Sequence, residues 1–179
     1  MNTAFANVRV LGGGNRFAFD GETIATAPSN AEAIDGKGLT LAPGIIDLGV
    51  FAVDRAACRA GGITRVGLMP DQSPILDDPG IIRRAALMGK PDLWVHPLAA
   101  ATRGLQGTDL AEMAINASAG ARAVATGRRW IGDAGVMRKV LAYARDCGLT
   151  VIAHAEDGGL AGDAVASEGL TATLLGLDA

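Results

Sequence analysis

The sequence predicts an α/β protein in which short apolar strands alternate with amphipathic helices. Glycine is abundant, at 25 of 179 residues, whereas aromatic residues make up only 4% of the chain. Ala-rich segments alternate along the chain with Val- and Ile-rich segments. Helices packed closely on strands and joined by short turns account for this composition better than an all-β sandwich does.

Composition also bounds the kind of protein. With 49% hydrophobic residues, the chain is long enough for one ordinary domain with a buried core. It has 16 Lys and Arg against 19 Asp and Glu and no basic patch, so nucleic acid is not an expected partner. Neither a signal peptide nor an apolar run of about 18 residues is present, so no membrane association is expected. Cys58 and Cys147 are isolated, which is typical of a reducing compartment, and a cytoplasmic location is expected.

A small antiparallel β unit is predicted in residues 1–43. Its strands are Phe5–Leu11, Arg16–Ala27 and Leu39–Ala42. Its turns are at residues 12–14, around 28–30 and at 35–38. The three glycines at 12–14 predict a loop rather than a phosphate cradle, because Phe17 stands where the third glycine of a GxGxxG motif belongs.

From Gly44 onward the pattern becomes strand–helix repeats. The predicted strands are Gly44–Phe51, Ile63–Met69, Asp92–Leu98, Ala121–Thr126 and Thr150–Ala155. The predicted helices are Asp54–Ala60, Asp78 to about Met88, Asp109 to about Gly120, and Ala134–Cys147. Asp78 suits an N-cap because Pro79 follows it, and Asp109 with Glu112 has the spacing of a capping box. Gly148 suits the end of the last helix.

Two architectures fit five strands alternating with four helices. An open, doubly wound sheet could be complete at this length. A (β/α)8 barrel typically needs about 250 residues. Composition and length by themselves therefore favour the open sheet.

Polar side chains at the strand ends are the candidate site residues. His154 ends a strand and is followed by Glu156 and Asp157, so it is either a metal ligand or general base, or a hydrogen-bonded structural residue. His96 lies inside a strand and is expected to be structural. Asp71 follows a strand and could bind a cation or polar ligand, or simply cap its loop.

Basic residues follow two further strands. Arg103 lies in a polar loop, and loop arginines are usually solvated. Arg128 and Arg129 stand beside Trp130, where they either bind an anion or form an exposed turn or interface. No GxSxG, P-loop or HExxH motif is present, so spacing alone assigns no reaction.

Six stretches, in order along nearly the whole chain, resemble the dihydroorotase branch of the amidohydrolase superfamily. They are LAPGIIDL at 41–48, AGGITRVGLMPDQSP at 60–74, ATRGLQGTDLAEM at 101–113, IGDAGVMRKVLAYA at 131–144, HAEDGGLA at 154–161 and SEGLTATLLGL at 167–177. The resemblance implies a β-sandwich built from both chain ends and a (β/α)8 barrel that holds one or two zinc ions. It implies hydrolysis or formation of the ring amide of dihydroorotate in pyrimidine biosynthesis. The expected fold thus becomes an N-terminal β-sandwich portion in residues 1–43 and a truncated TIM-type barrel of five strands in 44–179.

Departures from the family pattern fall at its site residues. Gly49 and Phe51 occupy the positions of two zinc-binding histidines, and alternation places both on one strand face. The strand that carries a metal-bridging Asp in the family reads Ala125–Arg128 here, without a carboxylate. Asp71 replaces an Asn that helps to hold the substrate carboxylate, and Arg55 does not align with the family's substrate-binding arginine. A single remaining ligand, His154, is too few for a catalytic zinc site, which normally has three protein ligands.

We therefore expect a dihydroorotase-like protein that has lost its zinc site and acts as a structural partner of aspartate transcarbamoylase, in a homo- or hetero-oligomer. Zinc is expected to be absent or weakly bound, through His154. Asp71 and Arg128 are the predicted substrate-binding residues. Two alternatives stay open: an active cyclic amidohydrolase with an unusual metal arrangement, and a binding protein that holds a small molecule in the old barrel mouth.

Overall fold

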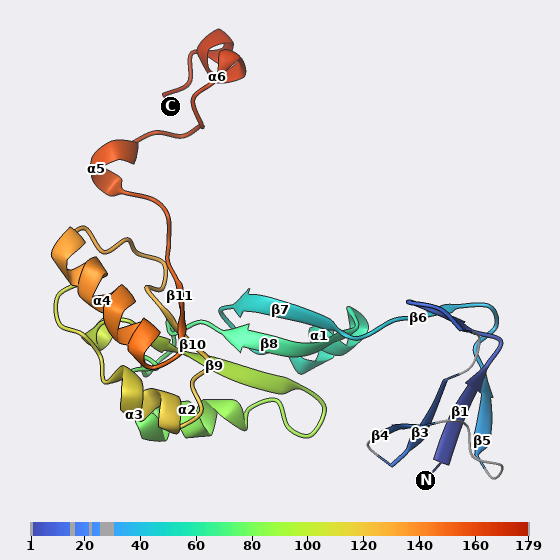
Figure 1. The fold of residues 1–179 in the computed structure, drawn as a ribbon. Helices are drawn as coiled ribbons and strands as arrows, with labels where there is room; N and C mark the ends of the chain where they lie inside the picture. The colour runs from blue at the N-terminus through green and yellow to red at the C-terminus, as the bar shows by residue number, and fades with distance from the viewer. Residues whose placement is uncertain (1, 15–16, 22, 26–30, 179) are drawn as a thin grey trace. The chain divides into compact units, whose positions relative to one another are not determined.

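A computed structural model describes residues 2–14, 17–21, 23–25 and 31–178 (Figure 1). Contacts divide the chain into two units, Met1–Gly44 and Ile45–Ala179. None of the helices in these described ranges is long and apolar enough to cross a membrane.

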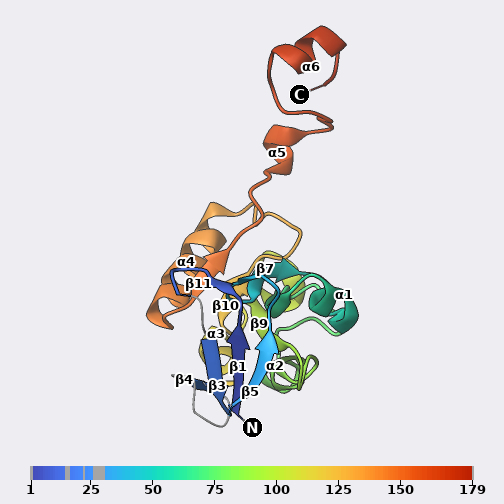
Figure 2. The same ribbon diagram turned by 90° about the vertical axis from the view of Figure 1, so that its right-hand side faces the viewer.

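The first unit consists of short strands. They are β1 (Asn2–Ala6), β2 (Arg9–Val10), β3 (Phe17–Asp20), β4 (Thr23–Ala25), β5 (Glu32–Asp35) and β6 (Thr40–Leu41). Strands β4, β3, β1 and β5 lie side by side in one sheet, which Figure 2 shows, and β2 pairs with β6. The β1–β3 and β3–β4 pairs are antiparallel, but β1–β5 and β2–β6 are parallel. The prediction of an antiparallel unit was therefore wrong in part, because the unit is mixed.

Two backbone turns explain why the predicted strands are divided. Asn7 has φ +53°, in the left-handed region, and this turn separates β1 from β2 within the predicted strand Phe5–Leu11. Gly21 has φ +61° and separates β3 from β4 within Arg16–Ala27. The polar turn predicted around residues 28–30 lies outside the described residues.

The second unit is built on a parallel sheet of five strands with helices between them. The strands are β7 (Ile45–Val50), β8 (Ile63–Leu68), β9 (Trp94–Ala100), β10 (Ala123–Ala125) and β11 (Thr150–Ile152). The intervening helices are α1 (Arg55–Ala60), α2 (Pro79–Ala86), the 3₁₀ turn η1 (Arg103–Leu105), α3 (Met113–Ser118) and α4 (Ala134–Asp146). Two short helices, α5 (Gly158–Ala161) and α6 (Leu170–Leu175), follow the last strand.

Strand order identifies the architecture as a curled half-barrel. The strands are arranged β7-β8-β9-β10-β11, each parallel to the one before it in the chain. A doubly wound sheet reverses its strand order at a switch point, whereas a (β/α)8 barrel adds each strand next to the last. The open sheet that composition favoured is thus wrong, and the first five strands of a TIM-type barrel are confirmed.

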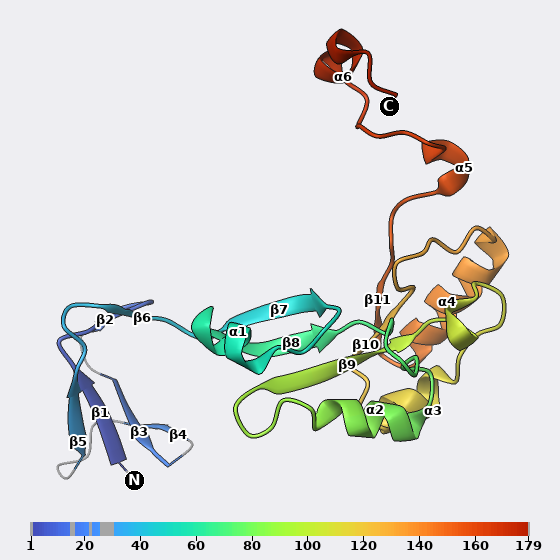
Figure 3. The ribbon, with the colours of Figure 1, turned by 180° about the vertical axis from the view of Figure 1, so that it is seen from behind.

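Helices cover one face of this sheet (Figures 1 and 3). Alternate strand residues, such as Val66, Leu68 and Val95, are buried against Cys58 of α1 and Ile82 of α2. Farther along the sheet, Val124 is buried together with residues of α3 and α4: Met113, Val140 and Ala144. The opposite, concave face carries a smaller apolar cluster of Met69, Leu98, Ala123 and Ala125.

Aspartates begin three of the four main helices. Asp54 accepts a hydrogen bond from the N–H of Ala57 at 3.0 Å, and Asp133 accepts one from Val136 at 2.9 Å. Asp78 accepts from the N–H of Gly80 at 2.7 Å, as its sequence context predicts. These caps set where the chain turns back along the sheet after each strand.

Two predicted boundaries are wrong. Asp109 and Glu112 do not form a capping box: α3 begins at Met113, and the Glu112 carboxylate pairs with Arg103 at 3.1 Å. Strand β9 begins at Trp94 rather than Asp92, and the Asp92 carboxylate is bound to Arg55 at 2.6 Å and to Arg59 at 3.2 Å.

Candidate ligand site at the strand carboxyl ends

The three site residues predicted from sequence follow the carboxyl ends of strands of the same parallel sheet. Asp71 follows β8, Arg128 follows β10 and His154 follows β11, while Phe51 comes directly after β7. The carboxyl ends of parallel strands meet at one edge of a sheet, and enzymes with this barrel place their active sites there. The structure brings three of these residues together: Asp71 accepts a hydrogen bond from the backbone of Arg128, and the Arg128 side chain contacts Phe51.

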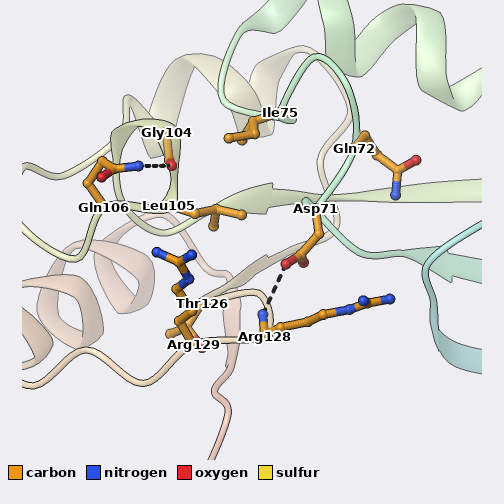
Figure 4. A pocket seen from close by; sticks show the side chains of 9 residues that line it. All are labelled: Asp71, Gln72, Ile75, Gly104, Leu105, Gln106, Thr126, Arg128 and Arg129. Atoms are coloured by element: carbon orange, nitrogen blue, oxygen red, sulfur yellow. Dashed lines mark hydrogen bonds between the residues drawn. The ribbon is translucent and has the colours of Figure 1, made fainter.

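Asp71 links the loops after β8 and β10. Its Oδ1 accepts the backbone N–H of Arg128 at 3.0 Å, across 57 residues of sequence (Figure 4). Gly127 lies directly against this carboxylate: with φ +73°, a Cβ there would stand 2.8 Å from Oδ1 and 2.9 Å from Oδ2. We call Asp71, Gly127 and Arg128 the loop clamp. Only glycine fits at position 127 of this clamp.

The Arg128 side chain leaves the loop clamp in the direction of β7. Its guanidinium carbon lies 3.9 Å from the centre of the Phe51 ring, a cation–π contact. The Gln72 amide holds the backbone of the same segment, because its Nε2 donates to the carbonyl oxygens of Phe51 and Met69, both at 3.1 Å. The positive charge of Arg128 therefore lies over the ring of Phe51.

His154 and Arg128 both line a cavity at the strand ends. The His154 backbone N–H donates to the Thr126 hydroxyl at 2.9 Å, and its Nε2 lies 3.5 Å from a Glu156 carboxylate oxygen. The cavity has a volume of about 460 Å³, and its other walls include Phe51, Met69 and Ile152. His154 thus shares a cavity with Phe51 and with Arg128.

Few metal donors stand at these strand ends among the described residues. Gly49 offers no donor atom, Phe51 presents a hydrocarbon ring, and Arg128 brings a cation. Within the described ranges, no three His, Cys, Asp or Glu side chains come together in an arrangement that could hold a metal ion. Catalytic zinc normally takes three protein ligands, and His154 is one imidazole.

A separate pocket opens between the loops that follow β8, β9 and β10 (Figure 4). Its volume is about 350 Å³, and it is lined by Asp71, Gln72, Ile75, Gly104, Leu105, Gln106, Thr126, Arg128 and Arg129. We call it the mouth pocket. Sequence reasoning singled out neither Thr126 nor Gln106. The only signal for them was position, because Thr126 ends one predicted strand and Gln106 lies in the loop after another.

The other candidates lie apart from the mouth pocket or are already paired. The Arg103 guanidinium bonds the Glu112 carboxylate. His96, in β9, has its Nε2 3.3 Å from Arg65 Nη1. Burial and the nearby cations Arg65, Arg122 and Lys90 lower the pKa of His96 below its ordinary 6.5. The expectation that His96 is structural fits this position within the sheet.

Comparisons with known proteins give a consistent result. No protein-family model matches the chain. It is 39% identical over 165 residues to the dihydroorotase of Geotalea daltonii, a match that covers 84% of this chain and 39% of that protein. It is 38% identical over 179 residues to the dihydroorotase of Syntrophotalea carbinolica, covering 91% of this chain and 41% of that one. The chain therefore spans about two fifths of the length of these curated relatives.

A solved structure shares the fold. The L-hydantoinase (dihydropyrimidinase) of Arthrobacter aurescens superposes with a TM-score of 0.70 and 17% sequence identity. The superposition covers 87% of this chain and 41% of the hydantoinase. At this identity the match supports the barrel architecture and not the chemistry.

Proposed function

The chain belongs to the dihydroorotase family, and from this premise we propose that it is a member that has lost the zinc site at its strand ends. In this proposal it acts in pyrimidine biosynthesis, in the cytoplasm, as a non-catalytic structural partner. The partner that the family resemblance implies is aspartate transcarbamoylase.

The observation that carries the proposal is the contact between Arg128 and Phe51. The resemblance places a zinc-binding imidazole at position 51 and a bridging carboxylate in the segment that contains Arg128. The structure has an aromatic ring and a guanidinium 3.9 Å apart instead. A zinc ion at this place would lack those donors and would face a fixed positive charge, which opposes its binding.

The loop clamp supports a structural role for this edge of the sheet. Asp71, which replaces a substrate-holding Asn of the family pattern, accepts a backbone N–H of the neighbouring loop. A side chain that ties two loops together stabilises their arrangement, and the Arg128 N–H occupies one acceptor position of its Oδ1. The hydrogen bond holds the loops after β8 and β10 in one arrangement. In this proposal, that arrangement contributes to a surface for the partner protein.

Zinc analysis of the full-length protein tests the loss of the metal site. We expect far less than one zinc per chain after purification in zinc-containing buffer, and no ring opening of dihydroorotate. Stoichiometric zinc that disappears in the His154→Ala variant would contradict the proposal. Chelator-sensitive turnover of dihydroorotate would instead establish an active amidohydrolase.

A restored donor set tests whether Arg128 obstructs metal binding. Among the described residues, a Cβ at Gly49 would meet only the Met69 sulfur, at 4.0 Å, so a side chain has room to enter there. The Gly49→His, Phe51→His double variant keeps Arg128, and a matched triple variant adds Arg128→Asp. We expect zinc retention in the triple variant and not in the double one. Equal retention in both would show that the guanidinium is no obstacle.

The partnership is tested by mixing the two purified proteins. Co-elution with aspartate transcarbamoylase of the same organism, at about 10 μM of each protein, is the expected result in size-exclusion chromatography. Separate elution at that concentration would contradict the partnership without touching the metal-site proposal.

A further inference from the structure

The mouth pocket is lined by two arginines whose guanidinium groups form no ion pair within the described part of the chain. Arg128 and Arg129 both line this pocket, and neither forms an ion pair with a carboxylate of the described residues. Arg128 is directed onto Phe51 instead. Figure 4 shows the two arginine side chains diverging, with the Arg129 guanidinium on the side of Leu105 and Gln106.

We propose that the mouth pocket binds a small molecule through an oxyanion group, and that Arg129 is the residue that holds this group. A guanidinium forms charge-assisted, often bidentate, hydrogen bonds with carboxylate and phosphate oxygens. The site needs no metal, and it is independent of whether the protein supports another enzyme.

Two further polar side chains, those of Thr126 and Gln106, line the same pocket. Thr126 is 3% exposed, and its hydroxyl oxygen accepts the His154 N–H, so the hydroxyl still has a hydrogen that it can donate. The Gln106 amide donates one N–H to the Gly104 carbonyl at 2.9 Å and keeps its second N–H. Arg129, Thr126 and Gln106 thus supply the pocket lining with N–H and O–H donors, the groups that bind an oxyanion.

The pocket wall formed by η1 is held in an unusual backbone conformation. Gly104 has φ +57° and Leu105 has φ +55°, and a non-glycine residue in this region costs about 1–2 kcal/mol. Bonds from the loop to its supports maintain it: the Gly104 N–H donates to Asp77 at 2.8 Å and the Gly107 N–H to Thr102 at 3.0 Å. Strain that the surroundings maintain in this way is typical of ligand sites.

The volume and the charges narrow the ligand class. About 350 Å³ corresponds to a small metabolite rather than to a peptide or a nucleic acid. The Asp71 carboxylate in the wall limits the negative charge that the pocket accepts, because its Oδ2 is buried without a hydrogen-bond partner in the described structure. The ligand is therefore a small molecule with one carboxylate or phosphate group directed at Arg129.

Calorimetric titration of the full-length protein with inorganic phosphate and with succinate, in metal-free buffer, tests the site. We expect at least one probe to bind, and the tighter one distinguishes phosphate from carboxylate recognition. Arg129→Gln is expected to weaken binding at least about tenfold. Arg138→Gln, a change in α4 away from the pocket lining, makes the same charge change and should alter affinity less than about threefold.

Gln106→Leu gives a second variant in the same pocket, and it is expected to weaken binding without changing the net charge. Thermal unfolding of each variant checks that it is folded. Equal affinities of the Arg129 and Arg138 variants would overturn the assignment of Arg129. No binding of either probe to the wild-type protein at about 10 mM would overturn the site itself. Neither outcome bears on zinc content or on partner binding.

Discussion

Replacing Gly127 by alanine is the most direct test of the loop clamp. The residue has φ +73°, and the new Cβ would stand 2.8 Å and 2.9 Å from the two Asp71 carboxylate oxygens. These distances are too short for any relaxed structure, so Asp71 or the β10 loop must move. The hydrogen bond from the Arg128 N–H to Asp71, 3.0 Å long, is then lost or lengthened.

Two contributions determine the expected loss of stability. The left-handed backbone conformation costs an alanine about 1 kcal/mol relative to glycine. Loss of a hydrogen bond to a charged group costs about 1.5–3 kcal/mol. We therefore expect Gly127→Ala to lower the free energy of unfolding by about 3 kcal/mol, a large part of the stability of an ordinary domain.

Urea unfolding measures this loss, and Gly148→Ala is the matched control. Gly148 has φ +67°, and no atom of the described residues lies within 4 Å of where an alanine methyl group would stand. It therefore reports the backbone contribution alone, about 1 kcal/mol. Equal losses in the two variants would refute the clamp. In an Asp71→Ala background the cost of Gly127→Ala should fall to that of the control, because the clashing carboxylate is gone.

Two further predictions concern the sheet and its helices. Asp78→Ala removes the carboxylate that accepts the first N–H groups of α2 and should lower the free energy of unfolding by about 1 kcal/mol; an unchanged urea midpoint would contradict this cap. Because burial and nearby cations lower the pKa of His96 below 6.5, the unfolded state binds the proton more readily, and stability should fall as the pH drops below 6.5. His96→Gln should remove this part of the pH dependence between about pH 7.5 and 5.5, which urea titrations at several pH values would detect.

Much of the second unit could be predicted from local sequence signals. Asp54 before an Ala-rich segment and Asp78 before Pro79 mark helix starts that the structure confirms. Apolar runs such as Ile63–Met69 gave strands close to their observed bounds. These signals succeed because a cap or an apolar strand depends on residues that are adjacent in sequence. The Asp109–Glu112 spacing failed because Arg103 competes for the Glu112 carboxylate.

Long-range contacts were not predictable in the same way. Periodicity does not reveal strand order, so composition favoured the wrong sheet, and only the family resemblance pointed to the barrel. Sequence reasoning named Asp71 and Arg128 separately, and nothing in their spacing of 57 residues indicated that one would bond the backbone of the other. Nor did the Arg128–Arg129 pair indicate which guanidinium would stack on Phe51. The different directions of the two side chains follow the turn at Gly127, which only the folded chain defines.

The order of the strands has a consequence for how the sheet assembles. Because β7 to β11 pair in chain order, each new strand docks on the one synthesised just before it. Every pairing closes a loop of only one strand–helix unit, and short loops carry a small entropic cost. The sheet can therefore grow from one end during translation. The bond between Asp71 and Arg128 joins the loops after β8 and β10, which lie on either side of β9 in the sheet. It can therefore form only once β10 has docked. We therefore expect it to form late in folding, so that its loss would speed unfolding more than it would slow folding.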